Sequence, residues 1–117
     1  MNATQNTNTA LGRIGEEAAV KFLREKGYQI LVQNYRYRKD EIDIIAKHGK
    51  LLVFVEVKAR KNNYYGYPEE FVNKAKASNI IRAAQNYIVT KNWVSGIRFD
   101  IIAITGEELV HFEDAFY

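Results

Sequence analysis

The spacing of hydrophobic and polar side chains changes several times along the chain and marks the expected helices and strands. Residues 11–26 repeat apolar side chains at the three- and four-residue spacing of an amphipathic helix, and Gly27 ends the run. Residues 28–35 are rich in β-forming side chains and predict a strand. Residues 1–10 are rich in Asn and Thr and have no apolar run, so we expect a disordered segment there.

The most apolar strands are predicted between residues 41 and 60. The runs EIDIIAK and KLLVFVEVK flank His48-Gly49, a dipeptide typical of a two-residue hairpin turn. Residues 51–55 are apolar at every position, so both faces of this strand are expected to be covered. The second strand of the hairpin is therefore expected at the centre of a sheet.

The rest of the chain adds a loop, a helix and two strands. A loop is predicted over residues 61–67, a helix from residue 68 to about 89, and strands over 97–104 and 108–112. The element order is α-β-β-β-α-β-β, which predicts an α/β fold with a mixed central sheet flanked by helices. A chain of 117 residues has too few for a second core, so residues 11–117 are expected to form a single domain.

The amino-acid composition limits the kinds of catalytic and metal-binding site that the chain could form. The net charge is +3, which is compatible with a polyanionic partner without indicating one. Cysteine is absent, which excludes disulfides and thiolate nucleophiles, and the only histidines are His48 and His111, so a zinc site of the usual type is not expected. A bound metal would be a hard cation held by carboxylates. The chain shows neither a secretory signal nor a membrane-length apolar segment, so we expect a cytoplasmic protein.

The predicted hairpin brings acidic residues and a lysine to one face. With the two-residue turn described above, Asp43 lies opposite Phe54 and Glu41 opposite Glu56. Lys58 follows two positions later and points to the same side. Asp43 is then a diagonal neighbour of Glu56, close enough for both carboxylates to share one ion. The inference depends on the register of the hairpin.

Two carboxylates and a lysine on one face suit phosphodiester hydrolysis. Asp43 and Glu56 would hold Mg²⁺ or Mn²⁺, and Lys58 would orient a water molecule or neutralise charge on the phosphate oxygens. The alternative is structural, because Glu-x-Lys is common in strands as a cross-strand ion pair. The position of all three at the end of a doubly covered strand favours the functional interpretation.

A third acid lies in the first helix. Glu16 is aligned with the buried stripe of that helix, where a glutamate is unusual. Glu17 precedes Lys21 by four residues and is interpreted as a surface ion pair. Glu16 is therefore the candidate that would reach the metal or cap a neighbouring group.

These residues resemble the YraN-type family of bacterial predicted endonucleases. That family is itself similar to archaeal Holliday junction resolvases, within the restriction-endonuclease-like superfamily and its Asp…Glu-x-Lys motif. The resemblance covers nearly the whole chain after residue 10. The matching segments are Gly12-Arg13-Ile14-Gly15-Glu16, Asn34-Tyr35-Arg36, Glu41-Ile42-Asp43-Ile44-Ile45, Phe54-Val55-Glu56-Val57-Lys58-Ala59-Arg60, Gly66-Tyr67-Pro68, Lys74 and Arg98-Phe99-Asp100.

The resemblance implies an αβββαβ core of the restriction-endonuclease-like type. It also implies catalytic roles for Asp43, Glu56 and Lys58, with Glu16 as the helix-borne acid. One departure is visible, because the family usually has Gly before Glu-Ile-Asp and this chain has Asp40. A side chain at that position changes the start of the strand or adds an acid near the site.

Basic side chains surround the predicted acids. Arg36, Arg38 and Lys39 precede the hairpin, Arg60 and Lys61 follow it, and Lys74 is aligned with the apolar stripe of the second predicted helix. We expect these side chains, chiefly Arg36, Arg60, Lys61 and Lys74, to contact nucleic-acid phosphates, the alternative being solvated surface charges. Three loop tyrosines are candidates for stacking on unpaired bases, or for packing over a sheet edge: Tyr64, Tyr65 and Tyr67. Arg98 and Asp100 are interpreted as an ion pair that supports the sheet.

Two functions remain in view. The first is a metal-dependent endonuclease that acts on DNA, with branched or irregular structures as its candidate substrates and a homodimer where two strands are cut symmetrically. The second is a catalytically silent nuclease-like fold that binds nucleic acid or a protein. The intact set of Asp43, Glu56 and Lys58 favours the first, because a pure binding module gains nothing from clustered acids facing a phosphate backbone.

Overall fold

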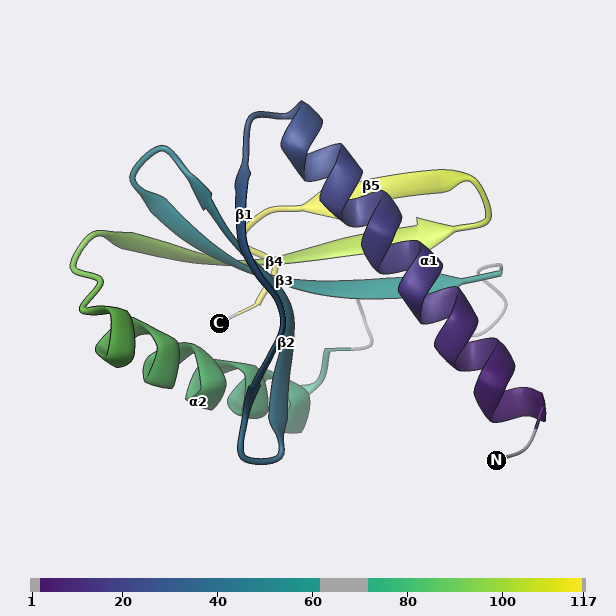
Figure 1. Ribbon diagram of the computed structural model, residues 1–117, viewed down its shortest axis with the longest axis horizontal. Coiled ribbons are helices and arrows are strands. Elements are labelled where there is room, and N and C mark those ends of the chain that lie inside the picture. The colour runs from purple at the N-terminus through teal and green to yellow at the C-terminus, as the bar shows by residue number, and fades with distance from the viewer. Residues whose placement is uncertain (1–2, 62–71, 117) are drawn as a thin grey trace.

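The computed structural model describes residues 3–61 and 72–116, with the backbone alone for residues 3–9 (Figure 1). The predicted order of elements and the α/β class are confirmed. In chain order the elements are α1 (Ala3–Glu25), β1 (Gln29–Tyr37), β2 (Asp40–His48), β3 (Leu51–Arg60), α2 (Lys74–Lys91), β4 (Gly96–Thr105) and β5 (Glu108–Phe112). The first six follow the αβββαβ order that the resemblance implied. No helix in the described ranges is long and apolar enough to cross a membrane.

The five strands form one mixed sheet in the order β1-β2-β3-β4-β5. β3 and β4 are parallel, and α2 lies between them in the chain, as a parallel pair requires a crossover. The other neighbouring strands are antiparallel. The doubly covered strand predicted from its apolar run is β3, which lies at the centre of the sheet.

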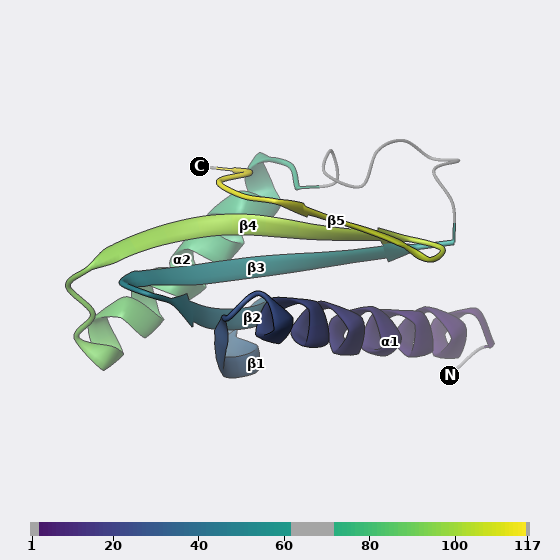
Figure 2. The same cartoon turned by 90° about the horizontal axis from the view of Figure 1, so that it is seen from above.

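The helices cover different faces of the sheet. α1 packs on the face that carries Val53 and Val55 of β3, whereas α2 packs on the face that carries Leu52 and Phe54. Figure 2 shows α1 along one side of β3 and β4. Because alternate residues of a strand point to opposite faces, Glu56 lies on the α2 side.

The sheet splits where β2 leaves β3. β2 pairs with β1 along almost its whole length, but with β3 only over residues 44–48. We call residues 34–43, which lie beyond those pairs, the β1–β2 ribbon; Figure 1 shows it turning away from β3 and β4. β3 itself continues beside β4 as far as Arg60. The fork between β2 and β3 therefore opens next to Asp43 and Glu56.

Close contact between α1 and β3 depends on a glycine. A Cβ atom added at Gly15 would lie 2.7 Å from the Cβ of Ala59, well inside the normal separation. Gly15 therefore lets α1 approach β3 more closely than any other residue would allow, and the next residue, Glu16, is brought toward the fork.

Three predicted boundaries differ from the structure. α1 begins at Ala3, so the backbone of residues 3–10 is helical where a disordered segment was predicted; no Gly or Pro interrupts the chain there. α2 begins at Lys74, six residues after the predicted start, because the Asn73 side chain caps it by accepting a hydrogen bond of 2.9 Å from the Lys76 N–H. Residues 68–71 lie outside the described residues.

The hairpin turn is the third difference. Its two residues are Gly49 and Lys50, because His48 pairs with Leu51. The predicted register, which paired Glu41 with Glu56, is therefore wrong by two residues. A shift of two keeps every side chain on its predicted face.

Candidate active site

Two carboxyl groups meet in the fork between β2 and β3. The hairpin register, continued one step beyond the pair of Ile44 and Val55, places Asp43 across from Glu56. Asp43 Oδ2 accepts a hydrogen bond of 2.8 Å from the backbone N–H of Val57. Its side chain thus serves a backbone donor that β2 no longer reaches once the strands separate. Glu56 is only 4% exposed, so both groups are held at the inner end of the fork.

Two lysines from different elements approach the same carboxylate. Lys58, two residues along β3, places its Nζ 3.8 Å from Glu56 Oε1. Lys76, in the first turns of α2, places its Nζ closer, at 3.4 Å. The structure therefore brings together the predicted set of Asp43, Glu56 and Lys58, and adds Lys76 to it.

The environment favours the protonated form of the two acids. Burial, and then the charge of Asp43, raise the pKa of Glu56 to about 7, against the opposing effect of Lys76 and Lys58. Burial also raises the pKa of Asp43, while the hydrogen bond from Val57 opposes the rise. The interaction between the two carboxyl groups adds to the rise in the pKa of Glu56 and opposes the rise in that of Asp43. Without a metal, the pair holds a shared proton near neutral pH.

The other acids lie around this pair. Burial raises the pKa of Glu16, and the charge of Asp43 and then that of Glu41 add to the rise, while a hydrogen bond from Asn34 opposes it. Glu16 therefore lies within electrostatic range of Asp43. Glu41 does not face Glu56, because it pairs with Arg36 of β1 at 3.1 Å.

The donor set fits a hard cation bound partly by water. Among the described residues, no three acidic or histidine side chains are grouped closely enough to hold a metal ion, so Glu16 does not complete a three-acid cage. Mg²⁺, however, is commonly held by one or two carboxylates, with water in its other positions. Asp43 and Glu56 match that type of site, because a cation would take the place of the proton they share.

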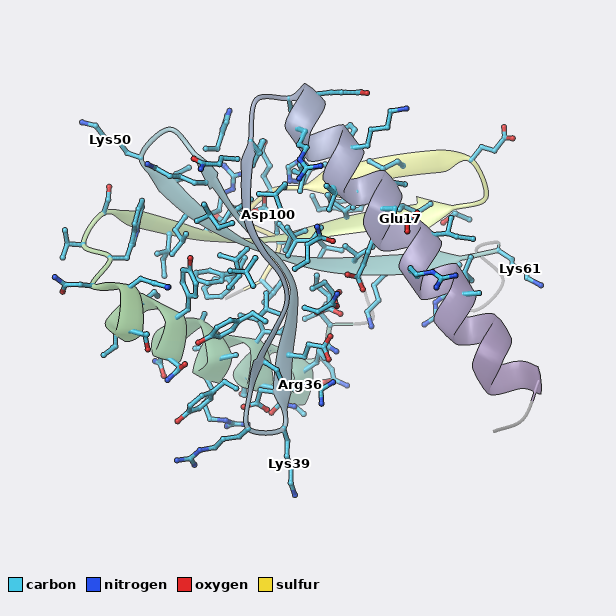
Figure 3. All side chains as sticks on the ribbon, viewed as in Figure 1. Glu17, Arg36, Lys39, Lys50, Lys61 and Asp100 are labelled. Carbon is cyan, nitrogen blue, oxygen red and sulfur yellow. The ribbon has the colours of Figure 1, made fainter. Side chains whose placement is uncertain are left out.

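The four side chains predicted to contact phosphates all lie on the surface, but on different elements of the fold. Arg36 lies on the β1–β2 ribbon, and Lys61 follows the end of β3 and points away from the fold (Figure 3). Arg60 ends β3 and is exposed. Lys74 is also exposed, although the helical spacing aligns it with the apolar stripe of α2. Residues 64–67, with the three tyrosines proposed for stacking, lie outside the described residues.

Lys76 is the site residue that the sequence analysis missed. It precedes Ile80 by four positions and Ala83 by seven, and both are buried on the face of α2 that packs on the sheet. The helical spacing alone would have placed Lys76 at the end of the buried stripe. Its contact with Glu56 joins residues 20 positions apart and depends on where α2 begins.

Asp40 and Asp100 do not belong to the acid pair. Asp40, which stands where the family usually has Gly, is buried and accepts a hydrogen bond of 3.0 Å from Arg82 Nε on α2. Asp40 therefore ties the β1–β2 ribbon to α2 without adding an acid to the fork. Asp100 accepts two hydrogen bonds of 2.8 Å from Arg98, which confirms the predicted ion pair.

The Asp100 cluster is a buried structural network. His111 Nε2 lies 2.7 Å from Asp100 Oδ2. Burial alone would raise the pKa of Asp100, but hydrogen bonds, chiefly from His111 and Arg98, hold it below its usual value. Asp100 pairs with Val55, whose side chain packs on the α1 side, so this network lies on the opposite face from Glu56.

Comparison with known proteins places the chain among relatives of similar length. Residues 15–104 match the profile of an uncharacterised protein family, UPF0102. A UPF0102 protein of Cytophaga hutchinsonii is 52% identical over 88% of this chain and 92% of its own. Others, from Flavobacterium psychrophilum and Acetivibrio thermocellus, are 45% and 48% identical, over 92% and 89% of this chain and 93% and 82% of theirs. The chain therefore belongs to the UPF0102 family, the YraN-type family that its motifs resemble.

Proposed function

We propose that this protein is a metal-dependent endonuclease that hydrolyses phosphodiester bonds in DNA. Mg²⁺ or Mn²⁺ is its cofactor, and branched or otherwise irregular DNA is its substrate class. The observation that carries the proposal is the pair of Asp43, partly buried, and Glu56, buried, in the fork, with two lysines beside it. Holding two carboxyl groups together out of water costs stability, and the pairing of the strands does not require it. Perturbed acids of this kind cluster at functional sites.

Each side chain has a role in this proposal. Asp43 and Glu56 hold the cation, and the Val57 N–H fixes the Asp43 carboxylate in place. When bound, the cation polarises the scissile phosphate and makes its bound water more acidic. Lys58 orients the attacking water or neutralises charge that grows on the phosphate oxygens. Lys76 leaves Glu56 when a cation binds there and becomes available to the phosphate.

The surface beside the acids has room for a nucleic-acid backbone. An open hollow of about 600 Å³ runs between α1 and the β1–β2 ribbon and is lined by Glu16, Arg13 and Arg36, among others. Arg60, Lys61 and Lys74 add positive charge beyond it. We expect these cations to contact DNA phosphates. The enzyme is proposed to be cytoplasmic. A homodimer is proposed where two strands are cut symmetrically.

A cleavage assay on branched and linear DNA with Mn²⁺ tests the proposal. The wild type should cleave and the Lys58→Ala variant should not, although that variant should remain folded and bind DNA with only a modest loss, because Lys58 is partly exposed at 22%. Lys50→Ala, in the distant hairpin turn, is the matched control and should cleave normally. Full cleavage by Lys58→Ala would remove the role assigned to that lysine.

The alternative is a nuclease-like fold that only binds nucleic acid or a protein. One observation favours it, namely that within the described part of the chain the acids form a pair and no larger metal-binding group. Calorimetric titration with Mn²⁺ separates the two functions. The nuclease should bind Mn²⁺, and the site should be lost in Asp43→Ala; the binding module should show no such site.

A further inference from the structure

A second, basic hollow lies between the tip of the β1–β2 ribbon and α2. Its volume is about 380 Å³, and it is lined by Arg38, Lys39, Asp40, Asn79 and Arg82. The hollow shares none of these residues with the acid pair. Arg38 and Lys39 form the turn of the ribbon, and Figure 3 shows Lys39 at its outer end.

Arg82 is held in place by two partners and keeps donors to spare. Its Nε donates to the buried Asp40 at 3.0 Å, and its Nη2 donates to Asn79 at 2.5 Å. A guanidinium has five N–H groups. Two are used here, so three have no partner among the described residues, and the side chain is 57% exposed. Asp40 and Asn79 thus fix the plane of a guanidinium that faces the hollow.

The charge of the hollow is positive. Arg38, Lys39 and Arg82 contribute three cations, and Asp40 contributes one carboxylate that already accepts from Arg82. The next basic residue of the ribbon, Arg36, is paired with Glu41. An excess of two positive charges, with free guanidinium donors, suits a phosphate group more than a neutral or cationic ligand.

The distances along β2 and α2 show how far this hollow lies from the acid pair. Asp40 and Asp43 are three residues apart on β2, about 10 Å along a strand. Lys76 and Arg82 are six residues apart on α2, about 9 Å along a helix. The offset is therefore about 10 Å, short enough for the phosphates of one nucleic-acid strand to reach both the hollow and the acid pair.

We propose that Arg38, Lys39 and Arg82 bind a backbone phosphate of the nucleic acid, a short distance along the strand from the bond that lies at Asp43 and Glu56. The position relative to the cleaved bond rests on the proposed nuclease function. Binding of a phosphate at the hollow does not, because it depends only on the three cations. The ribbon tip is then a positioning arm that sets where the backbone enters the fork.

The test is DNA binding measured by fluorescence anisotropy in EDTA, over a range of salt concentrations. The tip variant Arg38→Asn/Lys39→Ser removes two cations, and Asn tolerates the left-handed backbone at Arg38, where φ is 58°. Its affinity should fall about tenfold, and the slope of log affinity against log salt should become shallower by about one to two. Arg82→Gln, which keeps a donor for Asp40, should also weaken binding.

Lys21→Ser/Lys50→Ser is the matched control, because it removes the same charge from exposed positions on α1 and in the β2–β3 turn. It should bind within about twofold of the wild type. A tip variant that binds like this control would overturn the proposal, even if the wild type cleaves DNA. A tip variant that binds more weakly than the control supports it, even if no metal allows cleavage, and in that case the nuclease function fails alone.

Discussion

At the scale of single residues, Asp43 and Glu56 are held together by geometry and not by attraction. The Val57 N–H fixes Asp43, the central strand fixes Glu56, and a shared proton relieves the repulsion between them. In the proposed function, a divalent cation would relieve the same repulsion. The metal-free site would then be a strained version of the metal-bound one.

Asp43→Asn tests this strain. The amide oxygen of Asn can still accept from Val57, and its NH₂ group can donate to Glu56, so the metal-free variant should be as stable as the wild type or slightly more so. Mn²⁺ should reverse the ranking, because the wild type gains RT ln(1 + [Mn²⁺]/Kd), about 2.7 kcal/mol at a hundredfold excess over Kd. Thermal melts in EDTA and then in Mn²⁺ measure both effects. A variant that melts clearly lower in EDTA, with no metal-dependent gap, would indicate a structural carboxylate.

The raised pKa of Glu56 makes the stability of the metal-free protein depend on pH. The unfolded chain releases this proton near pH 4.5 and the folded chain near pH 7, so the folded state binds more protons between these values. Stability should therefore fall as pH rises from about 4.5 to 7, by on the order of 3 kcal/mol. Denaturant titrations in EDTA check this, and Glu56→Gln should flatten the dependence. A wild type whose stability rises through that window would contradict the raised pKa.

At the scale of elements, the site exists because β2 leaves β3 while α1 stays close to it. The fork frees backbone donors such as the Val57 N–H, and Gly15 lets α1 approach Ala59. Glu16 follows Gly15 directly and so comes within electrostatic range of Asp43.

Gly15→Ala tests the close packing of α1. The added methyl group would contact the Ala59 Cβ at 2.7 Å, and overpacking of this kind typically costs about 1–3 kcal/mol. The gain in helix propensity, about 1 kcal/mol, offsets only part of this. Gly12→Ala is the control, because nothing lies within 4 Å of its added Cβ, and it should melt at the same or a higher temperature. Adding Ala59→Gly to Gly15→Ala should restore part of the loss; a Gly15→Ala protein as stable as Gly12→Ala would show that the contact is not tight.

The helices and strands could be predicted because the local spacing of apolar residues marks each of them. The register of the hairpin and the start of α2 could not, because they depend on contacts between distant parts of the chain. The hairpin shows the limit. Gly is suitable at either residue of a two-residue turn, as the second residue of type I′ or the first of type II′. The structure uses Gly49 first, with φ 62°, which slides the register by two. The predicted face survived because two is the period of a strand, so Asp43 and Glu56 still meet, now directly across from each other.

The start of α2 could not be derived from local signals for a different reason. Pro68 and the two glutamates after it resemble a helix start, but Asn73 is the residue that caps the helix. The position of Lys76 beside Glu56 follows from that start and from the packing of α2 on the sheet. Local residue preferences predict neither the start of α2 nor its packing on the sheet.

At the scale of the whole molecule, the two acids of the proposed site lie at its centre, whereas the basic side chains lie around it. The fold is about 42 Å long and carries a net charge of only +3. The acid pair lies inside the fork, whereas the cations proposed for DNA lie on the ribbon, at the end of β3 and at the start of α2. In the proposed function, such a distribution would attract the DNA backbone to the rim and leave the centre for a metal ion.

DNA affinity should therefore depend strongly on salt and little on sequence. If Arg36, Arg60, Lys61 and Lys74 each neutralise one phosphate and the ribbon tip binds a fifth, log affinity should fall with log salt at a slope of about −4.5. Two duplexes of equal length and different sequence should give the same slope and nearly the same affinity, because the proposed contacts are to phosphates, which carry no sequence information. Anisotropy titrations in EDTA, at four or more salt concentrations, measure both quantities. A shallow slope combined with a strong preference for one sequence would mean that bases are read directly, and the cations on the rim would then be ordinary surface charges.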